Sequence, residues 1–116
     1  MEALTKQGNR VAVTASTGIA AIQINGVTLH AFAGIGIADS PAKQLAEAAR
    51  KNYTTRRRWQ EHSVLVIDEI SMISKELLDK VNAVAKACRS SPSAMGGMQV
   101  GLSAKSTSSF PILFFF

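Results

Sequence analysis

Asp68 and Glu69 are two adjacent carboxylates that directly follow the apolar run Val64–Ile67. A continuous apolar run rich in β-branched residues predicts a strand buried on both faces, as in a parallel α/β sheet. Ligands bind such sheets at the carboxyl ends of the strands. Two acids there suit a Mg²⁺–nucleotide site, in which one carboxylate holds the metal and the other orients or deprotonates the attacking water. We interpret the pair as the Walker B element of an NTPase, against the plainer alternative of a solvated acidic strand end.

The loop that should accompany such a site is missing from the printed sequence. No Gly-x-x-x-x-Gly-Lys-Ser/Thr segment occurs in the 116 residues. That loop normally supplies the lysine, the N–H donors and the Mg²⁺-binding hydroxyl around the β- and γ-phosphates. Losing even one preorganised donor typically costs about 10²–10³-fold in rate. We therefore predict that the isolated chain lacks ATPase activity, whatever role Asp68 and Glu69 have in a longer protein.

The composition predicts one small domain and excludes several classes of protein. Hydrophobic residues make up 47% of the chain, which is enough for a packed core. Cys88 is the only cysteine, so no internal disulfide can form, which fits a reducing compartment. We expect neither a membrane protein nor a secreted one, because no apolar stretch approaches the ~20 residues that span a bilayer and no signal core is present. The net charge of +5 is compatible with nucleic acid without proving it.

Strands and helices alternate along the chain, which predicts an α/β fold with a parallel sheet. The expected strands are Val11–Thr14, Val64–Ile67 and one that begins at Gln99, with Val27–Phe32 packed beside the first. The expected helices are Ile19–Ile22, Ala42–Arg50 and a third that Ser74 caps and that carries Cys88 as an inert buried thiol.

Between the second helix and the Walker-B-like strand lies a basic stretch, Lys51–Gln60. It contains three consecutive arginines, Arg56 to Arg58, followed by Trp59. We expect a solvated basic loop. The alternative is a phosphate-binding segment in which Trp59 is available for stacking on a base.

Three motifs together resemble the Pif-type DNA helicases of superfamily one B. Val11–Ala21 and Gly26–Gly36 are similar to motif Ia of that family, and Val64–Met72 is similar to motif II. Gly96–Val100 is similar to the lead-in to motif III. The motifs stand in the family's order, and the long motif Ia string makes the combination specific. The resemblance implies a partial RecA-like P-loop NTPase domain with a parallel sheet, lacking the P-loop strand and the second RecA-like domain.

Family members are ATP- and Mg²⁺-dependent helicases that move 5′ to 3′ on single-stranded DNA. They serve genome maintenance, including replication, repair, recombination and telomeres, in the nucleus and in mitochondria. By resemblance, Asp68 would hold Mg²⁺, directly or through water, and Glu69 would polarise the hydrolytic water. Motif Ia would lie along single-stranded or forked DNA. The residues expected to contact DNA are Thr14, Ser16, Thr17, Gly18, His30 and Phe32.

Each expected DNA contact has a plainer alternative. Hydroxyls and backbone N–H groups at Thr14, Ser16 and Thr17 suit phosphates, but these residue types are also ordinary turn formers. His30 on its own is more often a satisfied core or loop histidine. Phe32 can offer a ring to a sugar or base, although a place in the core is favoured.

The family pattern stops at both ends of the chain. Met1–Gln7 resembles the end of the helix that follows the phosphate loop, so we expect the chain to begin just after that loop. From Gly101 onward, the family's Gly-Asp…Gln-Leu-Pro-Pro motif is replaced by a Ser-rich and then Phe-rich segment. We therefore predict a partial helicase domain over residues 1–100. Residues 101–116 are predicted to be a divergent tail outside the fold, read out of frame or from an intron.

Three hypotheses follow for the chain as a whole. It is a fragment of an ATP-dependent 5′-to-3′ DNA helicase, a truncated product that binds single-stranded DNA weakly and hydrolyses nothing, or a degenerate gene product without a stable fold. Steep salt dependence of any DNA binding would favour the second hypothesis, because phosphate contacts release counterions. A cooperative thermal unfolding transition would exclude the third.

Overall fold

The computed structural model describes residues 10–68, 73–105 and 111–115, with 102–105 and 111–115 described through their backbone alone. Within these ranges, five strands form one sheet in the order β2-β1-β3-β4-β5. The first four strands in this order are parallel, and β5 is antiparallel to β4. The strands are β1 (Val11–Ala15), β2 (Val27–Thr28), β3 (Val64–Asp68), β4 (Gln99–Lys105) and β5 (Pro111–Phe115). The α/β fold with a parallel sheet is therefore confirmed.

Strand β3 lies inside the sheet, with β1 on one side and β4 on the other. All five of its residues are buried. This burial explains why its sequence is a continuous apolar run instead of an alternating one. At its carboxyl end, Asp68 is in register with Ala15 of β1 and Ser103 of β4. The fold thus places a carboxylate where β1 and β3 end, beside β4, which continues to Lys105.

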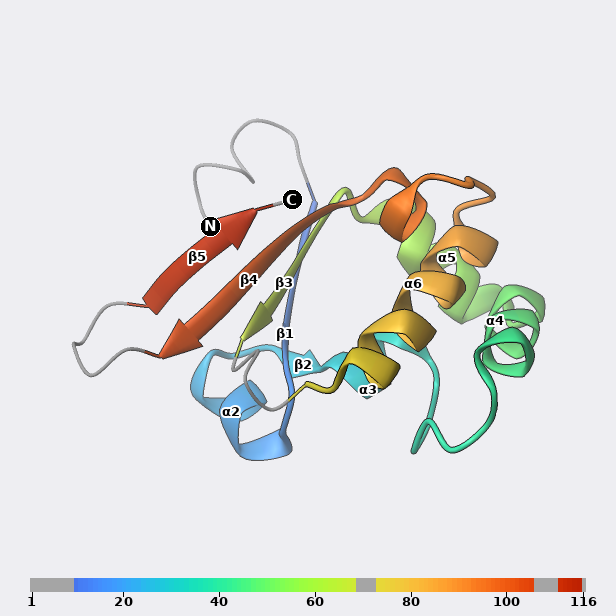
Figure 1. Cartoon of the computed structure of the whole chain (residues 1–116). Coiled ribbons are helices and arrows are strands. Elements are labelled where there is room, and N and C mark those ends of the chain that lie inside the picture. The colour runs from blue at the N-terminus through green and yellow to red at the C-terminus, as the bar shows by residue number, and fades with distance from the viewer. Residues whose placement is uncertain (1–9, 69–72, 106–110, 116) are drawn as a thin grey trace.

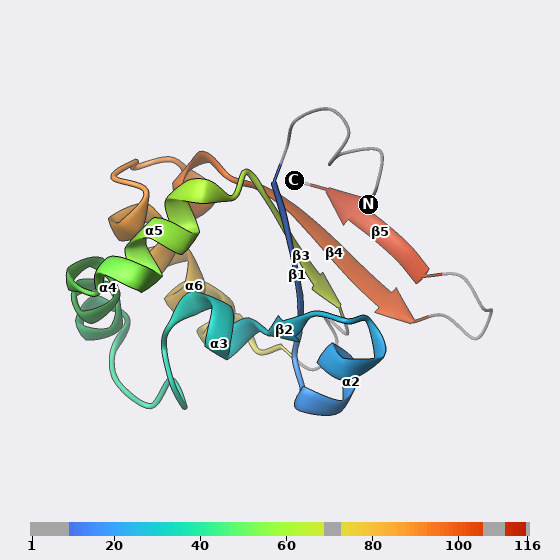
Figure 2. The ribbon, with the colours of Figure 1, turned by 180° about the vertical axis from the view of Figure 1, so that it is seen from behind.

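Helices α3, α4, α5 and α6 lie on one side of the sheet, whereas α2 lies near the carboxyl end of β1 (Figures 1 and 2). Their bounds are α2 (Gly18–Gln23), α3 (Leu29–Ala33), α4 (Ala42–Lys51), α5 (Tyr53–Glu61) and α6 (Lys75–Cys88), with a short 3₁₀ helix η2 (Ala94–Gly97) before β4. Ser74 caps α6 as predicted, because its Oγ accepts a hydrogen bond of 3.0 Å from the N–H of Leu77. Among the described residues, no helix has the length and apolar character to cross a membrane.

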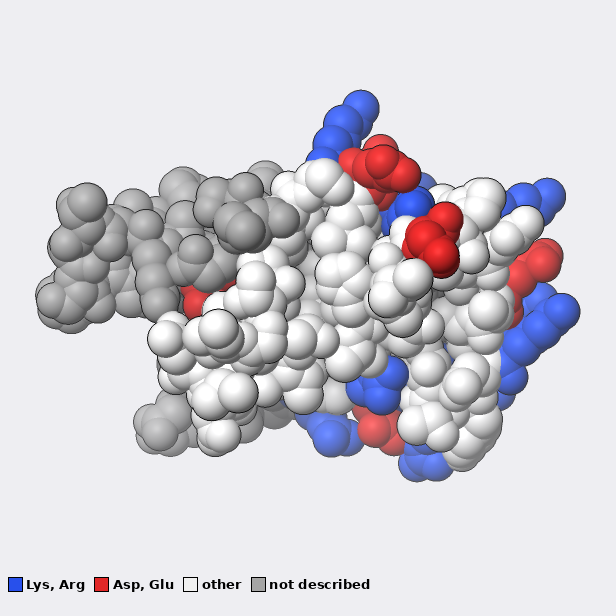
Figure 3. All heavy atoms as spheres, turned by 90° about the horizontal axis from the view of Figure 1, so that it is seen from below, with Lys and Arg blue, Asp and Glu red and all other residues white. Residues whose placement is uncertain are grey.

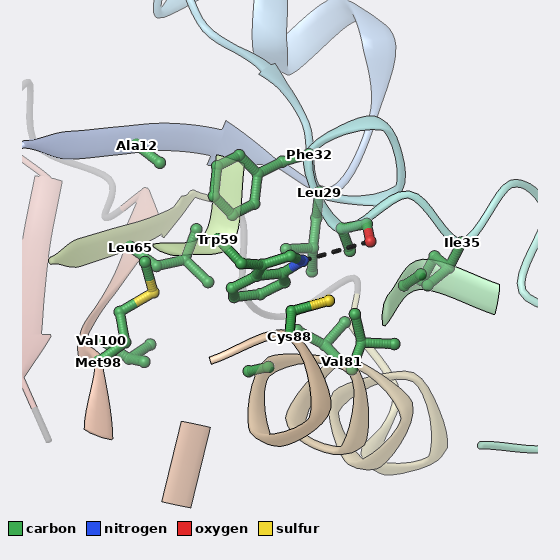
Figure 4. Close-up of a cluster of buried hydrophobic side chains, with 14 of the residues drawn as sticks. Ala12, Leu29, Phe32, Ile35, Trp59, Leu65, Val81, Cys88, Met98 and Val100 are labelled. Atoms are coloured by element: carbon green, nitrogen blue, oxygen red, sulfur yellow. Dashed lines mark hydrogen bonds between the residues drawn. The ribbon is translucent and has the colours of Figure 1, made fainter. Parts of the chain in front are cut away.

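The main core lies between the sheet and these helices, and Trp59 is its largest fully buried side chain (Figure 4). Leu65 and Ile67 of β3 face it from the sheet, and Val81 and Val84 face it from α6. Cys88 is also fully buried there, as expected. A second, smaller cluster joins Ala15 to α2. The apolar side of α6 faces this core, as the spacing of its apolar residues predicts.

The structure differs from the sequence expectation in two places. The stretch expected as a solvated basic loop is mostly the helix α5, which Asn52 caps through a 3.1 Å hydrogen bond from the N–H of Thr55 to Oδ1. The expected boundary at residue 100 is not a break in the sheet. Strand β4 continues to Lys105, and β5 pairs with it from Pro111 to Phe115. The turn expected over 1–7 lies outside the described residues.

Candidate nucleotide and DNA site at the strand ends

Asp68 is the acidic residue that the structure places at the carboxyl edge of the sheet. Its side chain is buried, with 6% of the residue exposed. Both neighbouring strands run parallel to β3, so their carboxyl ends converge on the same edge. This is the position at which open α/β sheets bind ligands. Glu69, the expected partner of Asp68, lies outside the described residues.

Ser16 lies directly beside Asp68. Its backbone N–H donates to the carbonyl oxygen of Asp68 at 3.4 Å, which ties the end of β1 to the end of β3. Its Oγ is shielded from solvent, yet it has no hydrogen-bond partner within the described part of the chain. A buried hydroxyl without a partner costs free energy and needs an explanation. The structure places the backbone of Ser16 against that of Asp68, and the DNA contact predicted for Ser16 stays a prediction.

Thr14 does not present its hydroxyl to a ligand. The residue is fully buried within β1, and its Oγ1 donates a 2.7 Å hydrogen bond to the carbonyl oxygen of Val66 in β3. The resemblance to motif Ia predicted a phosphate contact for Thr14, the last residue of the expected strand. The strand instead extends through Ala15, so the hydroxyl of Thr14 cross-links two strands. The expected phosphate contact by this side chain is therefore corrected.

Thr17 and Gly18 form the exposed part of the turn between β1 and α2. Thr17 is the N-cap of α2, and its Oγ1 accepts a 3.2 Å hydrogen bond from the N–H of Ala20. Gly18 is the first residue of that helix, and a Cβ placed on it would meet no atom within 4 Å. Open space next to exposed polar backbone is compatible with the DNA contact predicted for both residues, which stays a prediction.

His30 is half-buried on α3 and lines a pocket of about 260 Å³ together with residues at the start of α6, among them Ser74 and Lys80. The ammonium of Lys80 already has two partners, the carbonyl oxygen of Ala38 at 2.6 Å and the carboxylate of Glu76 at 3.3 Å. Lys80 therefore holds the loop after α3 against α6. The pocket brings His30 to a polar surface, and its DNA contact stays a prediction.

Phe32 belongs to the core, which was the favoured alternative in the sequence. Only 3% of the residue is exposed. Its ring meets that of Trp59 edge-on at 4.9 Å between centroids, and that of His62 at 5.4 Å. Figure 4 shows the Phe32 and Trp59 rings side by side above Val81 and Cys88. Neither aromatic ring has a free face for a base, so the expected stacking by Phe32 and the alternative of stacking by Trp59 are both corrected.

Helix α5 positions α3, a role that sequence reasoning missed. Arg58 donates from Nε to the carbonyl oxygen of Phe32 at 2.9 Å and from Nη2 to that of Ala31 at 3.0 Å. Trp59 donates from Nε1 to the carbonyl oxygen of Ala33 at 3.4 Å (Figure 4). These donors satisfy carbonyls that the short helix α3 leaves without intrahelical partners. The signals in the sequence were the capping residue Asn52 and the spacing of four residues between the buried Thr55 and Trp59.

Gly34 allows this close approach of α5 to α3. It adopts a positive φ of 76° where α3 ends, a conformation that favours glycine. A Cβ at this position would lie 2.6 Å from the side chain of Thr55. A larger residue would therefore separate the two helices and weaken the contacts that Arg58 and Trp59 make with α3.

The residues at the strand edge fit a hard divalent cation in a limited way. Mg²⁺ is usually held by one or two carboxylates together with waters and substrate phosphates. Asp68 offers one buried carboxylate. Ser16, whose backbone N–H donates to the carbonyl oxygen of Asp68, carries a hydroxyl without a partner in the described part of the chain. In the described ranges, no group of three His, Cys, Asp or Glu residues forms a closed metal site. The donor set thus suits an ion that a nucleotide would share, with phosphate oxygens and waters as its other ligands.

Comparison with known proteins identifies a family for this arrangement. The family model described as PIF1-like helicase matches residues 1–113. The curated "ATP-dependent DNA helicase PIF1" of Emericella nidulans is 47% identical over 95 residues, which cover 82% of this chain and 13% of that protein. The human protein of the same name is 48% identical over 87 residues, or 75% of this chain and 13% of its own length. The chain therefore spans 13% of the length of these two curated relatives.

Solved structures show the same likeness. The Pif1 helicase from Candida albicans superposes with a TM-score of 0.80 and 41% identity, over 90% of this chain and 24% of that one. A Bacteroides Pif1 in complex with ADP-AlF4 gives a TM-score of 0.72 at 29% identity, covering 90% of this chain and 24% of its own. A Bacteroides Pif1 bound to single-stranded DNA gives 0.69 at 29% identity, over 87% of this chain and 24% of that one.

Proposed function

Since this chain belongs to the PIF1-like helicase family, we propose that it is the part of an ATP-dependent DNA helicase motor that carries the Walker B carboxylate. Asp68 supports this proposal most directly. It is an acid that β3 buries at the carboxyl edge, between two parallel strands. A solvated acidic strand end, the plainer alternative, would be exposed. Burial of an ionisable group in such a place is the arrangement expected of a functional carboxylate.

The proposed roles divide between the residues of this edge. Asp68 holds Mg²⁺, directly or through a water, and Glu69 polarises the water that attacks the γ-phosphate. A Mg²⁺ ion held at Asp68 would supply neutralisation of the charge on the phosphate oxygens. Ser16, whose hydroxyl has no partner among the described residues, orients a water or a phosphate oxygen at the end of β1. The 116 residues contain no Gly-x-x-x-x-Gly-Lys-Ser/Thr loop, which such chemistry requires, so the isolated chain is proposed to hydrolyse no ATP.

The DNA-facing part of the proposal concerns the turn from β1 to α2 and the pocket at His30. Thr17 and Gly18 offer exposed hydroxyl and backbone groups to phosphates, and His30 offers its ring at the polar pocket. Nucleotide hydrolysis at the strand edge would then be coupled to movement along a single strand or at a fork in the 5′-to-3′ direction. Support comes from the likeness to Pif1 structures described with single-stranded DNA and with forked duplex DNA.

A chimera tests the proposal. Residues 10–100 of this chain would replace the corresponding segment of the Candida albicans Pif1 helicase, to which the fold is similar. We expect ATP hydrolysis stimulated by single-stranded DNA, and we expect Asp68→Asn to lower its kcat by about 10²-fold or more. Asp79→Asn, which removes an exposed acid on α6, is the matched control and should leave kcat unchanged. Unaltered hydrolysis by the Asp68→Asn chimera would contradict the proposal.

A further inference from the structure

Most of the net positive charge of the chain is concentrated in the hairpin of α4 and α5. Residues 42–61 contain six Lys and Arg residues and two Glu residues, a net charge of +4 within a chain whose total is +5. We define the basic α4–α5 surface as Arg50, Lys51, Tyr53, Arg56 and Arg57. In Figure 3, Lys and Arg side chains gather at the right-hand end of the molecule, where α4 lies in Figure 1, with some acidic ones beside them.

The cations of this segment fall into two groups. Arg58 is used inside the fold, because it donates to the carbonyls of α3. Arg57 pairs with Glu61. Arg50, Lys51 and Arg56, in contrast, have no acidic partner within 4 Å in the described part of the chain. Lys43, at the start of α4, likewise has no acidic partner within 4 Å in the described ranges. Four unneutralised cations therefore remain in the segment, and Arg50, Lys51 and Arg56 lie where α4 meets α5.

These cations are close to one another. Arg56 donates from Nη1 to the carbonyl oxygen of Arg50 at 3.1 Å, so the arginine of α5 reaches the last turn of α4. Arg50 and Arg56 also act on the buried Cys88: their positive charges oppose the rise in its pKa that burial causes. The dipole of α4 favours Arg50 and Lys51 in its last turn. It gives no reason for Arg56, which lies in the middle of α5.

Tyr53 is an exposed aromatic ring between these cations. It retains 60% of its surface in contact with solvent and is the one exposed large hydrophobic residue described within 42–61. The guanidinium carbons of Arg56 and Arg57 each lie 5.9 Å from its ring centroid, and Arg57 donates to its hydroxyl at 2.7 Å. An ordered, exposed ring among cations is the combination that single-strand binding proteins use for stacking and phosphate contacts.

We propose that the basic α4–α5 surface binds single-stranded nucleic acid without sequence preference. Arg50, Lys51 and Arg56 contact phosphates, and Tyr53 stacks on an unpaired base. The surface lies across the domain from α2 and the carboxyl ends of the strands (Figures 1 and 2). The inference goes beyond the proposed function, since neither Asp68 nor the turn at Thr17 takes part in it.

An acidic protein partner fits this surface less well. Stable protein interfaces contain a buried apolar centre surrounded by polar groups. Tyr53 is the only exposed large apolar side chain among the described residues of this segment, and its neighbours are charged. Stacking of an unpaired base needs no such centre, because one ring and nearby cations are sufficient.

Fluorescence anisotropy of the 116-residue chain tests the proposal with two labelled probes, oligo(dT) of 20 nucleotides and a 20-base-pair duplex. We expect the oligo(dT) to bind more tightly, with a dissociation constant of about 10⁻⁴–10⁻⁶ M that rises steeply with salt. The double substitution Arg50→Gln and Lys51→Gln should reduce the slope of log K against log salt by about 1.4, or about 0.7 per lost contact. Tyr53→Ser should weaken oligo(dT) binding about tenfold.

Matched controls separate this surface from net charge. Lys75→Gln with Lys86→Gln removes the same charge from α6 and should change the salt slope by less than half as much. Tyr53→Phe keeps the ring and should bind as the wild type does.

The proposal is overturned if the wild type binds neither probe or prefers the duplex, if the two double variants lose affinity equally, or if Tyr53→Ser binds normally. Displacement of oligo(dT) by poly-glutamate at the same concentration of charge would also overturn it, in favour of an acidic protein. ATPase activity of the chimera does not enter these outcomes, so each proposal can fail alone.

Discussion

The carboxyl edge of the sheet and the α4–α5 hairpin both carry charged residues in short stretches of sequence, yet they use them in opposite ways. At the strand edge, one buried acid lies among apolar strands, and its position follows from the backbone of β3. In the hairpin, consecutive arginines have different roles. Arg58 holds α3, whereas the half-buried Arg56 reaches the end of α4. The difference reflects where each charge lies: β3 fixes its acid at one end of a buried strand, while only helix residues three or four apart share a face, so Arg56, Arg57 and Arg58 point in different directions.

The largest expected difference is in the free energy of unfolding when the two large aromatic residues of α5 are replaced one at a time. Trp59→Ala should destabilise the chain by about 3–5 kcal/mol, because it empties a fully buried site and removes the hydrogen bond to Ala33. Tyr53→Ala should change stability by about 0.5 kcal/mol or less, since that ring is exposed. Urea denaturation followed by circular dichroism measures both. Equal losses would contradict the division of α5 into a core face and a binding face.

A smaller difference is expected between two neighbouring arginines. Arg58→Met should cost about 1.5–3 kcal/mol, because two carbonyls of α3 lose a charged donor. Arg56→Met is the matched control and should cost less than 1 kcal/mol, roughly the value of one exposed hydrogen bond. The same denaturation experiment compares them. If Arg56→Met proved the more damaging change, the assignment of Arg58 as the structural residue would be wrong.

At the strand edge, the corresponding comparison is between Thr14 and Ser16. Thr14→Val should destabilise by about 1–2 kcal/mol, because the carbonyl of Val66 loses its buried partner. Ser16→Ala should be neutral or slightly stabilising in the isolated chain, since its Oγ is buried without a partner. In the Pif1 chimera, Ser16→Ala should nevertheless lower the rate of ATP hydrolysis. A stability loss at Ser16 without a loss of activity would show that its hydroxyl is structural.

The smallest expected effect is chemical. Burial raises the pKa of the Cys88 thiol to about 11, so the reactive thiolate is scarce at pH 8. We expect a disulfide reagent such as Ellman's reagent to modify Cys88 in 6 M urea and to leave it unmodified in the folded chain at pH 8. Rapid modification of the folded chain would indicate that the core around α6 opens. The basic residues near Cys88, including Arg50 and Arg56, would then need a different arrangement.

The sheet and the place of Asp68 were predictable because both depend on contiguous sequence. The continuous apolar run Val64–Ile67 predicts a strand buried at the centre of a parallel sheet. The residue that follows this strand is therefore expected at the carboxyl edge. The cap at Ser74 was likewise local, since its partner is three residues away. Position along one element was therefore enough to find these features.

The features that were missed depend on contacts between distant residues. Thr14 bonds to a carbonyl 52 residues away, and Arg58 bonds to carbonyls 26 and 27 residues away. Their side chains look like surface groups until the elements that they join are placed together. The pairing of β4 beyond residue 100 with β5 has the same origin, because strand pairing depends on the neighbour as well as on local composition.

The central claim is that the strand edge, and not the α4–α5 hairpin, performs the nucleotide chemistry. The most direct test is to measure the ATPase activity of the Candida albicans Pif1 chimera for one variant of each region. Asp68→Asn and the double variant Arg50→Gln, Lys51→Gln would be assayed at saturating single-stranded DNA. We predict that Asp68→Asn lowers kcat by about 10²-fold or more and that the double variant keeps kcat within about twofold. A chimera that tolerates Asp68→Asn, or one that loses hydrolysis equally in both variants, would contradict this account.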